Sequence, residues 1–197
     1  MEKENKPPEP SFYVNFEKVY ARNIDSNMSL LNFLRHNHKL TGTKEGCSEG
    51  DCGACSVLIF EENGDLAPIN SCILKVGQIL DKNIVTIEGA SKLTSAKPLI
   101  EALNSKAASQ CGFCTPGFVM AALALKEKHK NPSERIIHDS LSGNLCRCTG
   151  YRPIVNGVQS LKEKVKFPIP KRGKGSSLKS AVFGKTTYIY PKSKKEL

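Results

Sequence analysis

The stretch GTKEGCSEGDCGACSV, residues 42–57, decides how the rest of the chain is interpreted. It places Cys47, Cys52 and Cys55 in one glycine-rich loop with the spacing C-x4-C-x2-C, and Cys72 follows at a distance. Glycine adopts positive φ at little steric cost, so successive backbone N–H groups can turn inward around an anionic group. Burying negative charge is costly unless such donors surround it. The loop is therefore suited to a buried metal–sulfur centre.

The spacing of this first set is typical of the [2Fe–2S] site of plant-type ferredoxins, in which four thiolates bind two iron atoms. Zinc sites usually pair C-x2-C with another C-x2-C or with histidines, which this set does not do. A Rieske centre needs two histidine ligands, and His36 and His38 precede the loop with the wrong spacing. The first four cysteines are therefore predicted to be iron–sulfur ligands.

A second set of four cysteines has the spacing C-x2-C, a long gap, then C-x-C. Its members are Cys111, Cys114, Cys146 and Cys148. Both pairs lie where predicted helices begin, and the positive end of a helix favours anionic sulfur. The spacing alone leaves zinc open, because C-x2-C is common in zinc sites. All eight cysteines are used by the two sets, and without a secretory signal a disulfide framework is not expected.

The character of the chain changes near Gly89. Strands are predicted before it at Ser11–Val14, Lys18–Tyr20, Ser56–Phe60 and Ile84–Glu88, with a helix at Ser29–Arg35. Helices are predicted after it at Lys97–Lys106, Pro116–Lys128, Ser133–Leu141 and Pro153–Lys166. The fold class is therefore α+β. The predicted organisation is a disordered leader (1–10), a strand-rich domain (11–89), a helical bundle (90–166) and a basic linker or tail (167–197).

The net charge of +10 is placed unevenly along the chain. Eleven lysines or arginines and two acids lie from Lys162 onward, so the cysteine-bearing body is close to neutral. Nucleic-acid binding needs a basic face on a folded domain, which the body does not offer. No apolar run approaches the ~20 residues that span a bilayer. The composition predicts a cytoplasmic protein with neither nucleic-acid nor membrane partners.

Three motifs in order, GTKEGCSEGDCGACSV, QCGFCTPGFVMAAL and GNLCRCTGYRPI, strongly resemble the iron–sulfur region of molybdenum hydroxylases, the xanthine dehydrogenase and aldehyde oxidoreductase family. The resemblance covers about residues 10–165. It implies a β-grasp plant-ferredoxin-like domain followed by a four-helix-bundle [2Fe–2S] domain, with the two cysteine sets as cluster ligands. It also implies that Gln110 and Cys148 face a molybdopterin cofactor.

By the same resemblance, the chain is the electron-transfer subunit of a molybdopterin-dependent hydroxylase and relays single electrons through two [2Fe–2S] clusters to a flavin. The implied partners are a molybdopterin-binding large subunit and an FAD-binding subunit or domain, and no substrate-catalytic residue is expected here. The end of the tail, residues 186–197, looks similar to the entrance of a flavin domain, which favours a xanthine-dehydrogenase-like member. The alternatives are a free ferredoxin-like carrier, a zinc-binding module, or the iron–sulfur subunit of an aldehyde, heterocycle or carbon monoxide dehydrogenase.

Overall fold

A five-stranded sheet lies at the centre of the computed structural model, which describes residues 9–61, 63–168, 180–191 and 193–194. The strands are β1 (Ser11–Val14), β2 (Glu17–Tyr20), β3 (Ser56–Phe60), β4 (Leu66–Asn70) and β5 (Asn83–Val85). Their order is β2-β1-β5-β3-β4, with β1 and β5 parallel and the other pairs antiparallel. Most of the predicted leader lies outside the described residues.

Strand β3 is buried on both faces, which explains its uninterrupted apolar sequence SVLIF. Successive side chains of a strand point to opposite faces. Val57 and Ile59 belong to an apolar core shared with Phe12 and Phe33, whereas Leu58 belongs to the core of the helical half. The sheet therefore separates two hydrophobic cores.

The short helix on the first face begins where the sequence predicts. Ser29 is the N-cap of α1 (Leu30–Asn32), and its hydroxyl oxygen accepts a hydrogen bond from the Asn32 N–H at 3.2 Å. The helix continues as a π-helical turn, η1 (Phe33–Asn37), and so extends beyond the predicted end. Its buried leucines fill the first core.

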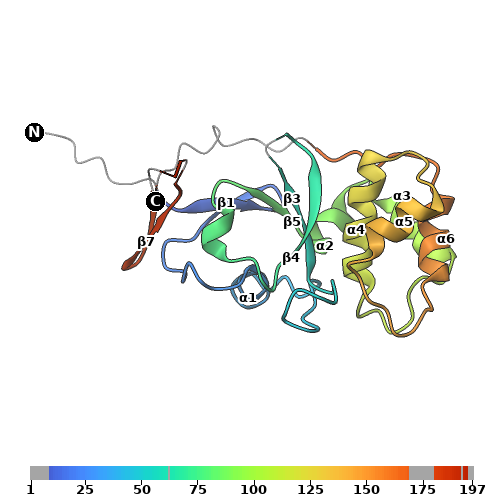
Figure 1. The fold of residues 1–197 in the computed structure, drawn as a ribbon, viewed down its shortest axis with the longest axis horizontal. Coiled ribbons are helices and arrows are strands. Elements are labelled where there is room, and N and C mark those ends of the chain that lie inside the picture. Colours follow the sequence, from blue (N-terminus) through green and yellow to red (C-terminus); the bar gives the residue numbers. More distant parts are fainter. Residues whose placement is uncertain (1–8, 62, 169–179, 192, 195–197) are drawn as a thin grey trace, which may run out of the picture.

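The helical half lies at the other end of the molecule (Figure 1). Its helices are α2 (Ile87–Lys92), α3 (Lys97–Ser105), α4 (Thr115–Lys128), α5 (Glu134–Leu141) and α6 (Arg152–Ser160). Helix α4 is buried on every side from Gly117 to Lys126, because the sheet, α2, α3 and α5 all pack against it. The helix is therefore the centre of the bundle.

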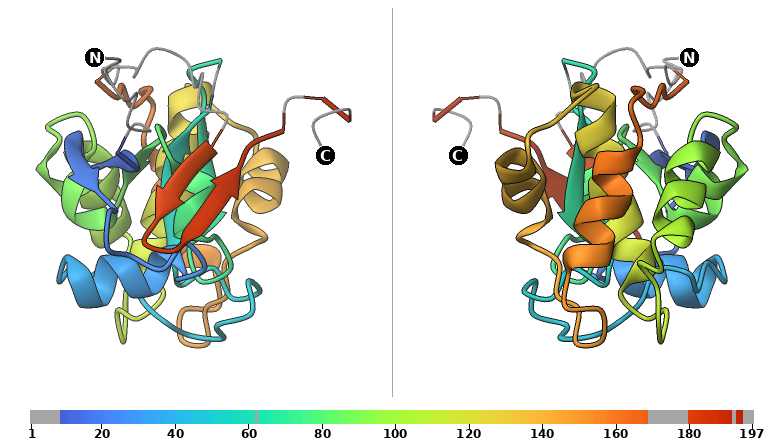
Figure 2. Two further views of the ribbon diagram at one scale, coloured as in Figure 1. Left: turned by 90° about the vertical axis from the view of Figure 1, so that its left-hand side faces the viewer. Right: turned by 90° about the vertical axis from the view of Figure 1, so that its right-hand side faces the viewer.

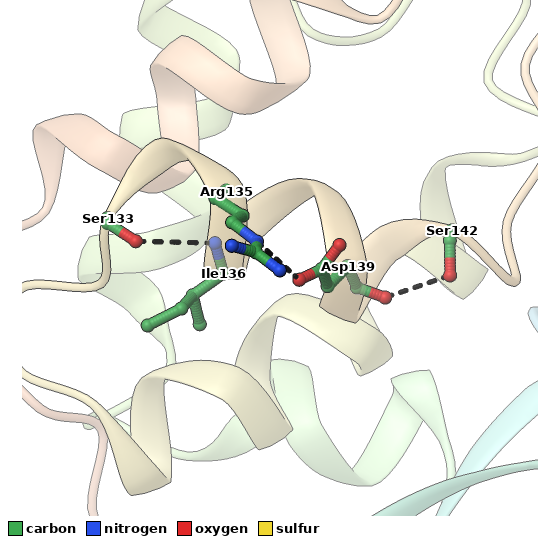
Figure 3. A network of polar contacts seen from close by, with 5 residues as sticks. All are labelled: Ser133, Arg135, Ile136, Asp139 and Ser142. Carbon is green, nitrogen blue, oxygen red and sulfur yellow. Dashed lines mark hydrogen bonds and ion pairs between the residues drawn. The ribbon is translucent and has the colours of Figure 1, made fainter.

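Helix α5 shows the local signals that place these helices (Figure 3). The Ser133 hydroxyl oxygen accepts from the Ile136 N–H at 3.4 Å, which satisfies an unpaired donor of the first turn. At the other end the Ser142 hydroxyl donates to the Asp139 carbonyl at 2.8 Å. Arg135 and Asp139 form an exposed ion pair at 3.8 Å.

One strand and one helix end earlier in the structure than the sequence predicts. The strand predicted to reach Glu88 ends at Val85, and α2 begins at Ile87, because the Glu88 carboxylate accepts from the Thr86 hydroxyl and the Gly42 N–H. The helix predicted to reach Lys166 ends at Ser160, and the Leu161 carbonyl accepts from Lys126. At both ends a hydrogen bond joins residues that are distant in the sequence.

The described part of the tail forms a hairpin, β6 (Ser180–Phe183) and β7 (Thr186–Ile189). It packs on the first core at the end of the molecule away from the helices (Figure 1). Among the described residues, no helix is long and apolar enough to cross a bilayer.

Candidate functional site

The first cysteine loop is arranged around the sulfur of Cys47. This Sγ accepts backbone N–H groups of Glu49, Asp51 and Cys52 at 3.5, 3.4 and 3.4 Å. The hydrogen bond from Cys52, followed by those from Glu49 and Asp51, lowers the pKa of the Cys47 thiol to about 7. The loop thus favours a thiolate at this position before any metal binds.

Glycines make room for the sulfur atoms of this loop. A Cβ on Gly46 would lie 2.8 Å from the Cys52 Sγ, so only glycine fits without a shift. Gly50 has φ +83°, a conformation that side chains rarely adopt. Gly46 thus allows a close approach and Gly50 a turn, as the glycine-rich sequence predicts for this loop.

The other two thiols of the first set meet at the base of the loop. Cys55 is buried at the start of β3, and Cys72 follows β4. Burial, then contact with Cys55, raises the pKa of the Cys72 thiol to about 11. The set is therefore two pairs, Cys47 with Cys52 and Cys55 with Cys72.

The second set has the same two-by-two arrangement. Cys114 is the N-cap of α4, and burial, then contact with Cys146, raises its pKa to about 12. Burial acts to raise the pKa of Cys146, but hydrogen bonds, first those from the hydroxyl and the N–H of Thr149 and then those from Cys148 and Cys114, outweigh it and lower the pKa. The Thr149 hydroxyl lies 3.1 Å from the Cys146 Sγ and its N–H lies at 3.4 Å.

The remaining pair, Cys111 and Cys148, lies on the outer side of the second set and is exposed. Contact with Cys111 raises the pKa of the Cys148 thiol. Gln110, directly before Cys111, is exposed as well. The structure therefore brings together the cysteines of the second set and leaves the two residues predicted to face a pterin on an open surface.

The paired thiols fit a diiron core, which takes two thiolates on each iron. All eight cysteines are free thiols. Across the part of the chain that the structure describes, no group of three or more His, Cys, Asp or Glu side chains converges on one point to hold a metal ion. A [2Fe–2S] core needs two thiolates on each of two irons. The donor set, the N–H groups aimed at sulfur and the close approach of the Cys52 sulfur to Gly46 all fit that group.

The two cysteine loops touch through their backbones. The Leu145 N–H donates to the Cys52 carbonyl at 2.9 Å, and the buried Asn144 side chain donates to the Gly53 carbonyl at 3.0 Å. Sequence reasoning missed Asn144 and Leu145, and only their position beside Cys146 could have suggested them. The contact joins Cys52 of the first set to the residue that directly precedes Cys146 of the second.

Two protein families match consecutive parts of the chain. Residues 14–77 match the family described as the 2Fe-2S iron-sulfur cluster binding domain, and residues 86–159 match the [2Fe-2S] binding domain. The matches decide for iron–sulfur over the zinc and disulfide alternatives.

Two similar proteins are much larger oxidoreductases. Aldehyde oxidase 1 of Rattus norvegicus is 43% identical over 160 residues and xanthine dehydrogenase of Emericella nidulans is 41% identical over 159 residues. Each match covers 78% of this chain, but the chain spans only 12% of the length of either relative.

Two solved structures that are similar to this chain are also oxidoreductases. Quinoline 2-oxidoreductase of Pseudomonas putida 86 is 34% identical with a TM-score of 0.69, and the match covers 78% of this chain and 91% of that one. Aldehyde oxidoreductase of Desulfovibrio gigas is 32% identical with a TM-score of 0.68, over 79% of this chain and 17% of that one. The fold and the paired thiols define a protein with two iron–sulfur units. The chain belongs to the iron–sulfur part of the molybdenum hydroxylase family, which includes xanthine dehydrogenase and aldehyde oxidoreductase.

Proposed function

We propose that this chain carries single electrons between a molybdopterin site and an FAD site that lie on partner chains or domains. Residues 11–89 would hold one [2Fe–2S] cluster and residues 90–166 the other. The ligands of the first are Cys47, Cys52, Cys55 and Cys72, and those of the second are Cys111, Cys114, Cys146 and Cys148. When bound, each cluster accepts and releases one electron at a time, which suits a relay between two centres that exchange electron pairs.

The observation that carries this proposal is the hydrogen bond from Leu145 N–H to the Cys52 carbonyl, 2.9 Å long. Cys52 is a proposed ligand of the first cluster, and Leu145 directly precedes Cys146, a proposed ligand of the second. The two ligand sets are thus joined by one hydrogen bond and short stretches of backbone. A free ferredoxin-like carrier would have no use for this connection or for the helical half.

Residues of this chain stabilise the negative charge on sulfur at each site. The N–H groups that point at Cys47, and Thr149 beside Cys146, stabilise thiolate sulfur. Buried Cys55 and Cys146 lie on the inner sides of the sites, whereas Cys111 and Cys148 are exposed. Electron entry from a docked molybdopterin partner is therefore proposed at the exposed side, with Gln110 and Cys148 facing the pterin.

The substrate belongs to the molybdenum-bearing partner. We favour a xanthine-dehydrogenase-like complex because residues 186–197 are similar to the entrance of a flavin domain. Aldehyde and heterocycle hydroxylases are the competing members, and the identities of 43% and 41% to an aldehyde oxidase and a xanthine dehydrogenase are nearly equal. Identifying the large subunit that co-purifies with the native chain distinguishes them.

The test of the relay is metal content and EPR of the full chain. We expect about four irons and about four acid-labile sulfides per chain, two of each for each cluster, and two EPR signals after dithionite reduction. Cys52→Ser should remove one signal and Cys146→Ser the other. A single signal in the unaltered chain, or stoichiometric zinc without sulfide, would overturn the proposal.

A further inference from the structure

The β6–β7 hairpin is an integral part of the strand-rich end of the molecule. Ala181 and Phe183 are 0% and 4% exposed and belong to the same apolar core as Phe12. The opposite face of the hairpin is open, since Val182 and Ile189 are 37% and 63% exposed. Figure 2 (left) shows the hairpin, in red, lying across the strand-rich end. The hairpin therefore has one docking face and one free face.

The docking face meets a notch made by Gly77. A Cβ at Gly77 would lie 2.5 Å from Cε2 of the Tyr188 ring, so the ring occupies the space that any other residue would fill. The Tyr190 hydroxyl donates a hydrogen bond to the Gly77 carbonyl. Burial raises the pKa of Tyr190, which keeps this hydroxyl protonated and able to donate. Tyr188 and Tyr190 thus both contact Gly77.

That position lies on the segment that carries Cys72. Gly77 is in a 3-10 turn, η2 (Val76–Ile79), which follows Cys72 closely along the chain. On its other side the turn is held by the N–H groups of Val76 and Gly77, which donate to the Met28 and Ser26 carbonyls at 3.0 and 2.9 Å. The segment from Cys72 to Ile79 is therefore held between the loop before α1 and the hairpin.

We propose that the β6–β7 hairpin is a clamp on this segment, and that it holds Cys72 in position against Cys55. The inference rests on the proposed function, in which Cys72 is a ligand of the first cluster. Residues within such a segment open locally when their contacts are few. Removing the contact with the hairpin should loosen Cys72. It should leave the second cluster unaffected, because the helices lie at the opposite end of the molecule (Figure 1).

Two adjacent residues on β7 provide a matched test in the full chain. Tyr188→Ala removes the ring from the Gly77 notch, whereas Ile189→Ala alters the free face of the same strand. Hydrogen exchange followed by mass spectrometry reports on residues 72–80, with residues 115–128 of α4 as the internal reference. We expect Tyr188→Ala to speed exchange in residues 72–80 by about tenfold, equivalent to about 1.4 kcal/mol of local stability. Ile189→Ala should change it little.

Cluster loss gives the second readout. With an iron chelator, the EPR signal that Cys52→Ser removes should decay faster in Tyr188→Ala than in Ile189→Ala, and the other signal should decay equally in both. Gly77→Ala, which blocks the notch from the opposite side, should reproduce the effect.

Two outcomes would overturn the clamp. One is equal exchange of residues 72–80 in the Tyr188→Ala and Ile189→Ala variants, and the other is an equal acceleration in α4, which would make the hairpin a general cover for the core. A failure of the proposed function is seen separately, as fewer than two clusters in the unaltered chain, and it leaves the exchange comparison readable.

Discussion

Gly53 and Gly117 allow the first cysteine loop and helix α4 to approach backbone to backbone. A Cβ on Gly117 would lie 2.2 Å from the Gly53 carbonyl oxygen. That oxygen accepts hydrogen bonds from the Ser56 N–H and hydroxyl and from the Asn144 side chain. Gly53 itself has φ +68°. The join between the two halves therefore depends on two residues without side chains.

Gly117→Ala should destabilise the protein by about 1–3 kcal/mol, because overpacking here must displace backbone and not a flexible side chain. Urea unfolding followed by circular dichroism measures the free energy of unfolding. The matched control is Gly143→Ala, where an added Cβ meets nothing within 4 Å. A surface change of that kind is expected to stay within about 0.5 kcal/mol. Equal losses of unfolding free energy in the two variants would show that the close approach at Gly117 does not determine stability.

Lys126 is a fully buried lysine on α4 that ties the helix to the chain after α6. Its Nζ donates to the carbonyls of Lys130 and Leu161, the latter at 2.7 Å, and burial lowers its pKa. Lys126→Met should cost about 1–3 kcal/mol of unfolding free energy, since two partly buried carbonyls lose the donor that the buried amine supplies.

The control for Lys126 lies on the same helix. Lys128 makes a surface ion pair with Asp65 at 3.4 Å and is half exposed, so Lys128→Met should cost at most about 1 kcal/mol. Thermal unfolding of both variants beside the unaltered chain makes the comparison. A Lys126→Met variant as stable as Lys128→Met would contradict a structural role for the buried amine.

At the scale of elements, the sequence predicts those whose signals are local. Ser29 and Ser133 cap the helices that follow them, and the prolines at 116 and 153 lie in first turns. The strands with alternating or continuous apolar residues are confirmed where one or both faces are buried. The end of α6 was not predictable, because Lys162–Lys166 suits a helix and the stop comes from the distant Lys126.

In the candidate sites too, features set by nearby residues are predictable from the sequence, and contacts between distant residues are not. The spacing of the eight cysteines predicts which side chains belong together, because loop geometry is local. The contact of Leu145 with Cys52 and the docking of Tyr188 in the Gly77 notch join residues far apart in the chain. Periodicity and composition do not predict such contacts, so the sequence gives no sign that the basic tail packs against Gly77.

His38 directly follows the π-helical turn η1, and its ring packs on Phe33 with centroids 4.7 Å apart. The residue is exposed overall, but partial burial of the imidazole lowers the pKa of His38 from its usual 6.5. In a window below pH 6.5 the unfolded chain therefore binds more protons than the folded one, and the free energy of unfolding falls as pH drops through it. Above pH 6.5 this contribution is fully present.

His38→Gln should therefore show a shallower loss of stability below pH 6.5 than the unaltered chain, with the same slope above it. Urea unfolding at a series of pH values from about 8 to about 5.5 measures both slopes. Parallel curves across the whole series would show that the ring is not desolvated by its contact with Phe33.

Across the whole molecule, the sheet separates two apolar cores that are built almost entirely without thiols. The strand-rich core contains Leu30, Phe33 and Ile84, and the helical core contains Leu99 and Met120, with Cys146 at its edge. The chain after α6 returns along the boundary between the halves, where the Phe167 ring meets Phe60 at 6.4 Å. Most of the apolar packing of the scaffold therefore comes from residues outside the cysteine loops.

Removing iron should consequently free the loops and leave the scaffold folded. Chelation under reducing conditions is expected to preserve the far-ultraviolet circular dichroism and to speed hydrogen exchange in residues 44–52 and 145–151. Small zinc domains behave differently, because in them metal binding supplies the folding free energy. Here the buried leucines, isoleucines and phenylalanines supply it through burial at about 25 cal/mol per Å². Loss of most of the dichroism on iron removal would mean that the clusters hold the scaffold together, and the two cores would then be insufficient to fold the chain.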